Sequence, residues 1–187
     1  MTPITLPGQQ ARDIDLAHQL ASETTQKAAA DALAASGQEK VPLLLEWIKT
    51  PPFPLDDVQL TTFDAGLADA FGALKVKEAI PFLTRNITIR RSPFTLPPWK
   101  TAETVMERLP AVAALIRIGA DALKALIDAP YSPMDMDQRL ARIFVVSRIA
   151  ATVSDKTQAI QYLRHAQAEA RLQNYWADEA LQFVGDR

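Results

Sequence analysis

The chain has 187 residues, of which 48% are hydrophobic and 22% are charged, so it can bury a sizeable core and is not disordered throughout. Its 20 basic and 22 acidic residues give a net charge of −2, which argues against a general polyanion-binding protein. Cysteine is absent, which excludes a disulfide framework, a thiol nucleophile and a cysteine-based metal site.

The first predicted unit covers about residues 12–50 and follows a leader, residues 1–11, that we expect to be extended because it contains two prolines. Residues 12–36 contain no proline or glycine and are rich in alanine, so they are predicted to be helical. Ser22 is able to cap a second start within this segment. Gly37 suits a left-handed C-cap, after which a second, shorter helix is expected.

The second predicted unit covers about residues 56–90. Asp56 or Asp57 is expected to cap a helix that runs to about Leu74, because a carboxylate at this position accepts hydrogen bonds from the first free N–H groups. Pro81 lies near the start of the helix that follows, where its missing N–H is tolerated. We expect this second helix to reach almost to the end of the unit.

The third predicted unit covers about residues 101–130 and begins at Thr101. Pro110 lies inside its first helix and is expected to kink it. Gly119 marks the turn into a second helix, which should end before Pro130.

The fourth predicted unit covers about residues 135–170, with its first helix from Asp135 to Thr152. The last segment, residues 171–184, is predicted to form a helix that covers the end of the array, so residues 12–187 are predicted to form one domain. In this last segment, four apolar residues follow helical spacing: Leu172, Trp176, Ala180 and Phe183.

An aliphatic residue followed three positions later by leucine occurs four times, at steps of 39, 43 and 37 residues. A step of about 40 residues is typical of arrays of two-helix units, in which each unit buries its apolar face against its neighbours. The pattern predicts an all-α fold, an α-solenoid of about four antiparallel helix pairs, with the four leucines buried between paired helices. The pairs are Val41 and Leu44, Ile80 and Leu83, Leu123 and Leu126, and Ile160 and Leu163.

One stretch of the second unit, residues 68–83, resembles the short bacterial HEAT-like repeat. In that repeat an alanine-rich helix ends in a Leu-Gly type turn, and the next helix begins with alanine, an aliphatic residue and proline. The resemblance implies a solenoid whose second helices line a concave surface. The matching positions here are Phe71, Gly72, Ala79, Ile80 and Pro81.

The repeat also places a polar or charged residue five positions beyond each aliphatic anchor, on corresponding turns of the second helices. Acid and base alternate in this column, which predicts either a ladder of surface ion pairs between neighbouring units or a partner-binding stripe. Trp47 lies beside the column and is either a hot-spot anchor for the partner or packed under the proline-rich connection that follows it. The column consists of Glu46, Arg85, Asp128 and His165.

The connection between the second and third units combines basic and aromatic residues, a composition suited to an acidic peptide or to stacking on nucleic-acid bases. Residues 75–117 carry eight basic and three acidic residues, so the middle of the chain is basic. We predict an acidic or negatively flanked partner here, the alternative being a loop whose aromatic side chains dock back on the array. The candidate residues are Arg90, Arg91, Phe94, Trp99 and Lys100.

No catalytic residue, metal site or cofactor is predicted. The two histidines, His18 and His165, lie in opposite ends of the array and form no metal-binding pair on a helix. No G-x-S-x-G elbow is present, and the six glycines are isolated, which disfavours a phosphate-binding loop. The carboxylate pairs at positions 56 and 57 and at positions 135 and 137 are explained by helix capping.

The leading hypothesis from the sequence is a non-enzymatic HEAT-like scaffold that binds a protein or peptide on its concave face. The alternatives are a DNA-binding protein or enzyme similar to the HEAT-like alkylpurine DNA glycosylases, which the net charge of −2 disfavours, and similarity to bilin lyase subunits. No apolar stretch approaches the length of a membrane span, and residues 1–12 lack the features of a signal peptide. We therefore expect a cytoplasmic location, unless an export signal has been trimmed.

Overall fold

Helices account for all the regular secondary structure that is described. The computed structural model describes residues 7–91, 101–128, 135–169 and 174–185, which contain eleven α-helices, two short 3-10 helices and no strand. The all-α class expected from the sequence is confirmed for these residues. None of the helices in the same ranges combines the length and the apolar character that crossing a membrane requires.

The first unit contains three α-helices and one 3-10 helix. The break between the first two lies around Ser22, as expected from the sequence, and Gly37 has a positive φ of 84°. The expected extended leader is wrong for residues 7–11, because α1 begins at Pro7, and a proline in the first turn loses no hydrogen bond. The elements are α1 (Pro7–Leu20), α2 (Gln26–Ala35), η1 (Gln38–Lys40) and α3 (Val41–Lys49).

In the second unit, Asp56 caps the first helix through a capping box. Its carboxylate accepts a hydrogen bond from the Gln59 backbone N–H at 2.8 Å, and the Gln59 side chain accepts one from the Asp56 N–H at 3.1 Å. The second helix ends earlier than expected, and the N–H of Ile89 donates instead to the Asn86 carbonyl in a turn. The elements are α4 (Asp57–Leu74), η2 (Lys77–Ala79) and α5 (Ile80–Arg85).

In the third unit, Pro110 starts a new helix instead of kinking a continuous one. Leu109 has φ −115° and ψ 84°, because a residue before proline is disfavoured in the helical region. Thr101 caps the first helix, and Gly119 turns with a positive φ of 81°, both as expected. The elements are α6 (Ala102–Arg108), α7 (Pro110–Ile118) and α8 (Ala120–Asp128).

The remaining helices are α9 (Met136–Ala150), α10 (Thr157–Glu169) and α11 (Asn174–Val184). Asp135 caps α9, since its carboxylate accepts a hydrogen bond from the Gln138 N–H at 2.8 Å.

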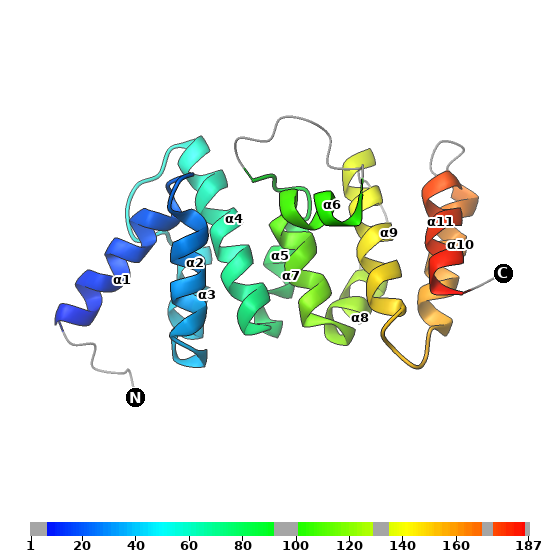
Figure 1. Ribbon diagram of the computed structural model, residues 1–187, viewed down its shortest axis with the longest axis horizontal. Helices are drawn as coiled ribbons and strands as arrows, with labels where there is room; N and C mark the ends of the chain where they lie inside the picture. The colour runs from blue at the N-terminus through cyan, green and yellow to red at the C-terminus, as the bar shows by residue number, and fades with distance from the viewer. Residues whose placement is uncertain (1–6, 92–100, 129–134, 170–173, 186–187) are drawn as a thin grey trace.

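The helices lie in two rows along the long axis of the molecule, in chain order (Figure 1). The front row consists of α2, α4, α7, α9 and α11, and the back row of α3, α5, α8 and α10. In the front row α4 packs against α2 and α7, and α9 packs against α7 and α11. Each back-row helix packs against one or more helices of the front row, while α1 and α11 lie at opposite ends.

The repeat leucines belong to the hydrophobic core, and Leu44, Leu83, Leu126 and Leu163 are each 0% exposed, so their predicted burial is confirmed. Gly72 allows α4 and α7 to approach closely, because a Cβ atom at this position would lie 2.7 Å from the Cα atom of Ala114.

Candidate partner-binding grooves

The predicted column of charged residues lies on the back row. Glu46, Arg85, Asp128 and His165 are all exposed, on α3, α5, α8 and α10 respectively. Glu46 pairs with Lys49 at 3.6 Å and Asp128 pairs with Lys124 at 3.1 Å, in each case within one helix. These two contacts differ from the ladder interpretation, which requires pairs between neighbouring units.

Trp47 lies in the core and not on the binding surface considered for it. Its side chain is 5% exposed, and its ring centroid lies 6.0 Å from that of Phe63. Phe63 also contacts Phe53 of the connection after α3, with 6.5 Å between centroids, and His18 stacks on Phe53 at 3.7 Å. Trp47 is therefore buried and not an exposed anchor, so the hot-spot assignment is corrected, and Phe63 lies between its ring and that of Phe53 in the proline-rich connection.

Arg90 and Arg91 are engaged within the molecule. Arg90 forms an ion pair with Asp137 at the start of α9. Arg91 forms an ion pair with Asp69 of α4 at 2.8 Å and donates hydrogen bonds to the Gln26 side chain at 2.9 Å and to a backbone carbonyl of α6. Partner binding by either arginine would compete with these contacts, and their assignment to a partner stays a prediction. The other three candidates of this connection, Phe94, Trp99 and Lys100, lie outside the described residues.

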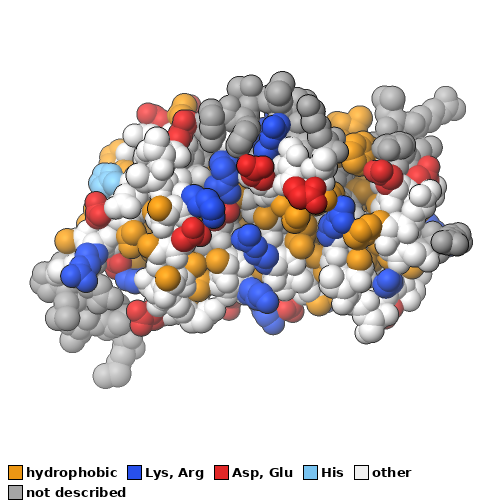
Figure 2. All heavy atoms as spheres, viewed as in Figure 1, with side chains coloured by type: hydrophobic (Ala, Val, Ile, Leu, Met, Phe, Trp, Pro, Cys, Tyr) orange, Lys and Arg blue, Asp and Glu red, His pale blue; other side chains and the backbone are white. Residues whose placement is uncertain are grey.

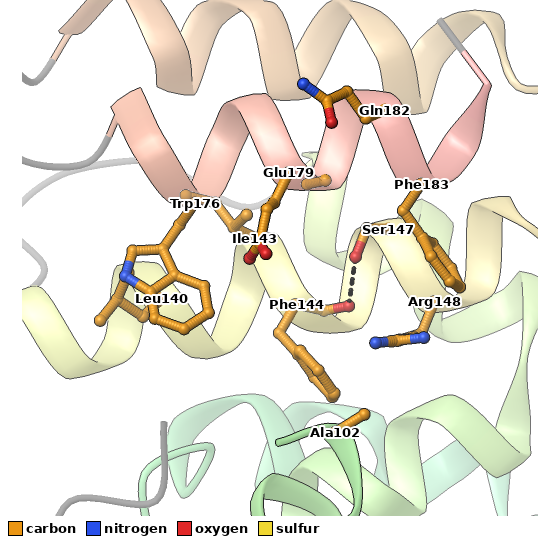
Figure 3. Close-up of a pocket in the computed structure, with 11 residues that line it drawn as sticks. Ala102, Leu140, Ile143, Phe144, Ser147, Arg148, Trp176, Glu179, Gln182 and Phe183 are labelled. Atoms are coloured by element: carbon orange, nitrogen blue, oxygen red, sulfur yellow. Dashed lines mark hydrogen bonds between the residues drawn. The ribbon is translucent and has the colours of Figure 1, made fainter. Parts of the chain in front are cut away.

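A groove of about 470 Å³ lies between α9 and α11, with α6 at one edge (Figure 3). We call it the aromatic groove. Positions four apart lie on one face of a helix, which brings Leu140, Phe144 and Arg148 of α9 to the groove. Trp176 and Phe183 of α11, seven positions apart, also lie on one helical face and line the groove. The groove thus combines a large apolar surface with a guanidinium group.

Arg148 lies between two aromatic rings in this groove (Figure 3). Its guanidinium carbon is 5.0 Å from the ring centroid of Phe144 and 4.0 Å from that of Phe183. Both distances are within the range of cation–π attraction. Phe183 nevertheless remains 48% exposed, and none of the ion pairs among the described residues includes Arg148.

Comparisons of the chain with protein-family models, curated proteins and solved structures found no match. The grooves are therefore interpreted from their own residues.

Two glutamates contribute negative charge near Arg148. Glu179 of α11 lines the groove on the side of Trp176 (Figure 3). Glu103 lies in the first turn of α6, where its own backbone N–H and the Thr101 hydroxyl hold its pKa below the ordinary value, with a smaller contribution from Arg148. Glu103 is fully exposed, so solvent screens its attraction to the guanidinium.

A second groove, of about 600 Å³, lies over α2, α4, α6 and α7. We call it the central groove. Its lining includes the small residues Gly72, Ala73 and Ala113, and the charged residues Lys75 and Arg117. Figure 2 shows side chains of both charges over this part of the front row, and hydrophobic side chains over α9 and α11. The acidic residues Asp31, Asp69 and Glu107 also line the central groove, so it is mixed in charge and, unlike the aromatic groove, is lined by no aromatic ring among the described residues.

The carboxyl group of Asp64 on α4 is partly buried, and burial raises its pKa to about 6.

Among the residues that the structure describes, no group of three or more histidine, aspartate or glutamate side chains is placed to hold a metal ion.

Phe144 and Arg148 were not among the predicted site residues, and Phe183 was expected in a covering helix but not as an exposed ring. The F-x-x-x-R spacing of α9 was a usable signal, since a ring and a guanidinium four residues apart lie on one helical face. The second ring comes from α11, and no local pattern indicates that these two helices meet.

Proposed function

We propose that the protein is a non-enzymatic scaffold that binds a protein or peptide, built as a HEAT-like α-solenoid of about four helix pairs. Two rows of helices in chain order support this architecture, because the units of such arrays pack against their neighbours. The observation that carries the proposed function is the aromatic groove, in which the half-exposed Phe183 lies against Arg148. Aromatic residues and arginine contribute much of the binding energy in protein interfaces.

We place the partner across the front row, whereas the HEAT-like resemblance implied the surface of the second helices. Both the aromatic groove and the central groove lie over front-row helices. A partner that spans them contacts the aromatic groove at one end and mixed charge in the middle (Figure 2).

A protein partner is favoured over a nucleic acid because of the charges on this face. Basic residues that bind a phosphate backbone neutralise its charge and thereby release the counterions condensed on the nucleic acid. Arg90 and Arg91 already form intramolecular ion pairs with Asp137 and Asp69. Their charge is therefore partly neutralised before any ligand arrives.

A random peptide library displayed on phage tests the proposed function, with the whole chain as bait. We expect enriched peptides whose affinity falls about tenfold or more for Phe183→Ala, the loss typical of an interface hot spot. Val58→Ala is a matched control, because Val58 is an exposed hydrophobic residue, 65% accessible, outside both grooves. Peptides that instead respond to Arg117→Ala in the central groove also support the scaffold. A selection that enriches nothing over a bait-free surface contradicts it.

A further inference from the structure

We propose that the aromatic groove recognises an extended segment of the partner in which an apolar side chain is followed by a carboxylate, with Arg148 as the anion-binding group. This inference rests on the proposed function, since it specifies the chemistry of the partner at one of the two grooves.

The position of Arg148 is the first argument for a carboxylate. A long, flexible side chain usually loses entropy when a ligand orders it. Here Phe144 and Phe183 already restrict the guanidinium, at 5.0 Å and 4.0 Å from their ring centroids. The rings attract the positive charge of the guanidinium. They accept no hydrogen bonds from its N–H groups, which point outward in the guanidinium plane. Planar N–H donors held in this way suit the two oxygens of a carboxylate.

The apolar part of the groove is the second argument. Phe183 is 48% exposed, a large fraction for a phenylalanine, and the half-buried rings of Phe144 and Trp176 line the same groove. An apolar side chain of a partner removes this surface from water, which is favourable in proportion to the area covered.

The charges of Glu179 and Arg148 distinguish the two ends of the groove. Glu179 lies on the Trp176 side, while Arg148 lies between Phe144 and Phe183 (Figure 3). A carboxylate on the Trp176 side would meet the like charge of Glu179, whereas one beside Arg148 meets an opposite charge. The charge of Glu103 also acts near Arg148, but solvent screens it because Glu103 is fully exposed. Trp176 and Phe183 are seven residues apart on α11, which corresponds to roughly 10 Å along the helix axis. An extended chain spans that distance in about three residues.

The occupant is therefore a partner segment of the pattern apolar residue, two spacer residues, then aspartate or glutamate. Binding of a second copy of this chain in the groove is a competing outcome, which the experiment below separates.

The test compares two peptides that differ only in charge, acetyl-Leu-Ala-Ala-Glu-amide and acetyl-Leu-Ala-Ala-Gln-amide. Each is titrated into the full-length protein labelled with 15N, and the indole N–H signal of Trp176 and the Nε–H signal of Arg148 are followed. We expect the glutamate peptide to bind about tenfold more tightly, the size of one charge-assisted hydrogen bond. The difference should shrink as the salt concentration rises, because the site is open to solvent.

Two variants test whether the preference for the glutamate peptide arises in the aromatic groove. Arg148→Gln should remove the difference between the two peptides, while Arg117→Gln, an exposed arginine outside the aromatic groove, should preserve it. The salt titration of the unaltered protein needs no variant, so the inference stays testable even if Arg148→Gln fails to fold.

Three results of the peptide titrations overturn the inference, and a fourth result without peptide does so as well. They are equal affinity for the two peptides, a preference that survives Arg148→Gln, and the absence of shifts at Trp176 and Arg148 at millimolar peptide. Concentration-dependent shifts at both signals without peptide would assign the groove to a second copy and also overturn it. If the peptides fail but the phage selection yields binders elsewhere on the front row, the scaffold function stands and this inference alone is lost.

Discussion

At the scale of single residues, Asp64 links the packing of α4 to pH. Burial raises the pKa of its carboxyl group to about 6, above the ordinary 3.8, so the folded protein holds this proton more tightly than the unfolded chain. A raised carboxyl pKa stabilises the fold at low pH, and the contribution is lost as the pH rises from about 4 to about 6. At neutral pH the charged form of Asp64 therefore costs stability.

We expect Asp64→Asn to raise the free energy of unfolding at pH 7.5 by on the order of 1 kcal/mol, a value discounted for the solvent that reaches this half-buried side chain. The same variant should differ little from the original protein near pH 4, where the buried carboxyl group is already neutral. Urea unfolding at the two pH values measures both effects. An equal change at both would show that the charge of Asp64 is not the cause.

Gly72 is the other residue whose identity has a clear physical reason. A Cβ atom there would lie 2.7 Å from the Cα atom and 2.8 Å from the Cβ atom of Ala114, and these atoms belong to a helix and not to a flexible side chain. Gly72→Ala should lower the free energy of unfolding by about 1–3 kcal/mol through overpacking, despite the better helix propensity of alanine. In Gly8→Ala, the matched control on α1, the new Cβ atom meets nothing within 4 Å. Chemical denaturation that ranks the two variants equally would exclude a tight contact between α4 and α7.

At the scale of elements, Arg91 joins three helices that are distant in the sequence. Its guanidinium contacts Gln26 of α2 and Asp69 of α4, which lie 65 and 22 residues away along the chain. Its backbone N–H donates to the carbonyl of Arg108 at 2.9 Å. The chain that follows α5 is thereby fixed against the front row.

Arg91→Ala should therefore cost about 2–3 kcal/mol of stability, because it leaves the carboxylate of Asp69, only 13% exposed, without its charged partner. Lys124→Ala breaks an ion pair whose side chains are 77% and 59% exposed and should cost less than about 0.5 kcal/mol. Thermal unfolding of the two variants makes the comparison. Similar losses would indicate that Arg91 makes only surface contacts.

Helix boundaries were largely predictable from the sequence, whereas the partners of long side chains were not. Asp56, Thr101 and Asp135 cap helices as expected, because capping depends on residues within one turn. Trp47 was suited to an interface or to packing in the interior, and Arg91 was expected to bind a partner, because their contacts depend on residues far along the chain. The aromatic groove was missed for the same reason, because it forms only where α9 and α11 meet.

At the scale of the whole molecule, contacts mostly join neighbouring helices of the two rows. In the proposed solenoid, stability is approximately a sum of unit and interface contributions, so a defect at one end should remain local. Removal of α11 uncovers the apolar surface of α9 and α10 on which Leu181 and Val184 are buried. Hydrogen exchange should then accelerate in α9 and α10, with α2 and α4 unchanged. Uniform acceleration along the chain would indicate one cooperative unit.

The placement of α1 and α11 at opposite ends of the long axis has a mechanical consequence (Figure 1). In the proposed solenoid, a force applied between the two ends of the chain loads the helix pairs in series, so each pair bears the full tension. The weakest interface then yields first and lengthens the molecule by one unit while the others remain folded. A partner bound across two adjacent pairs would act as a clamp, raising the force at which that step occurs.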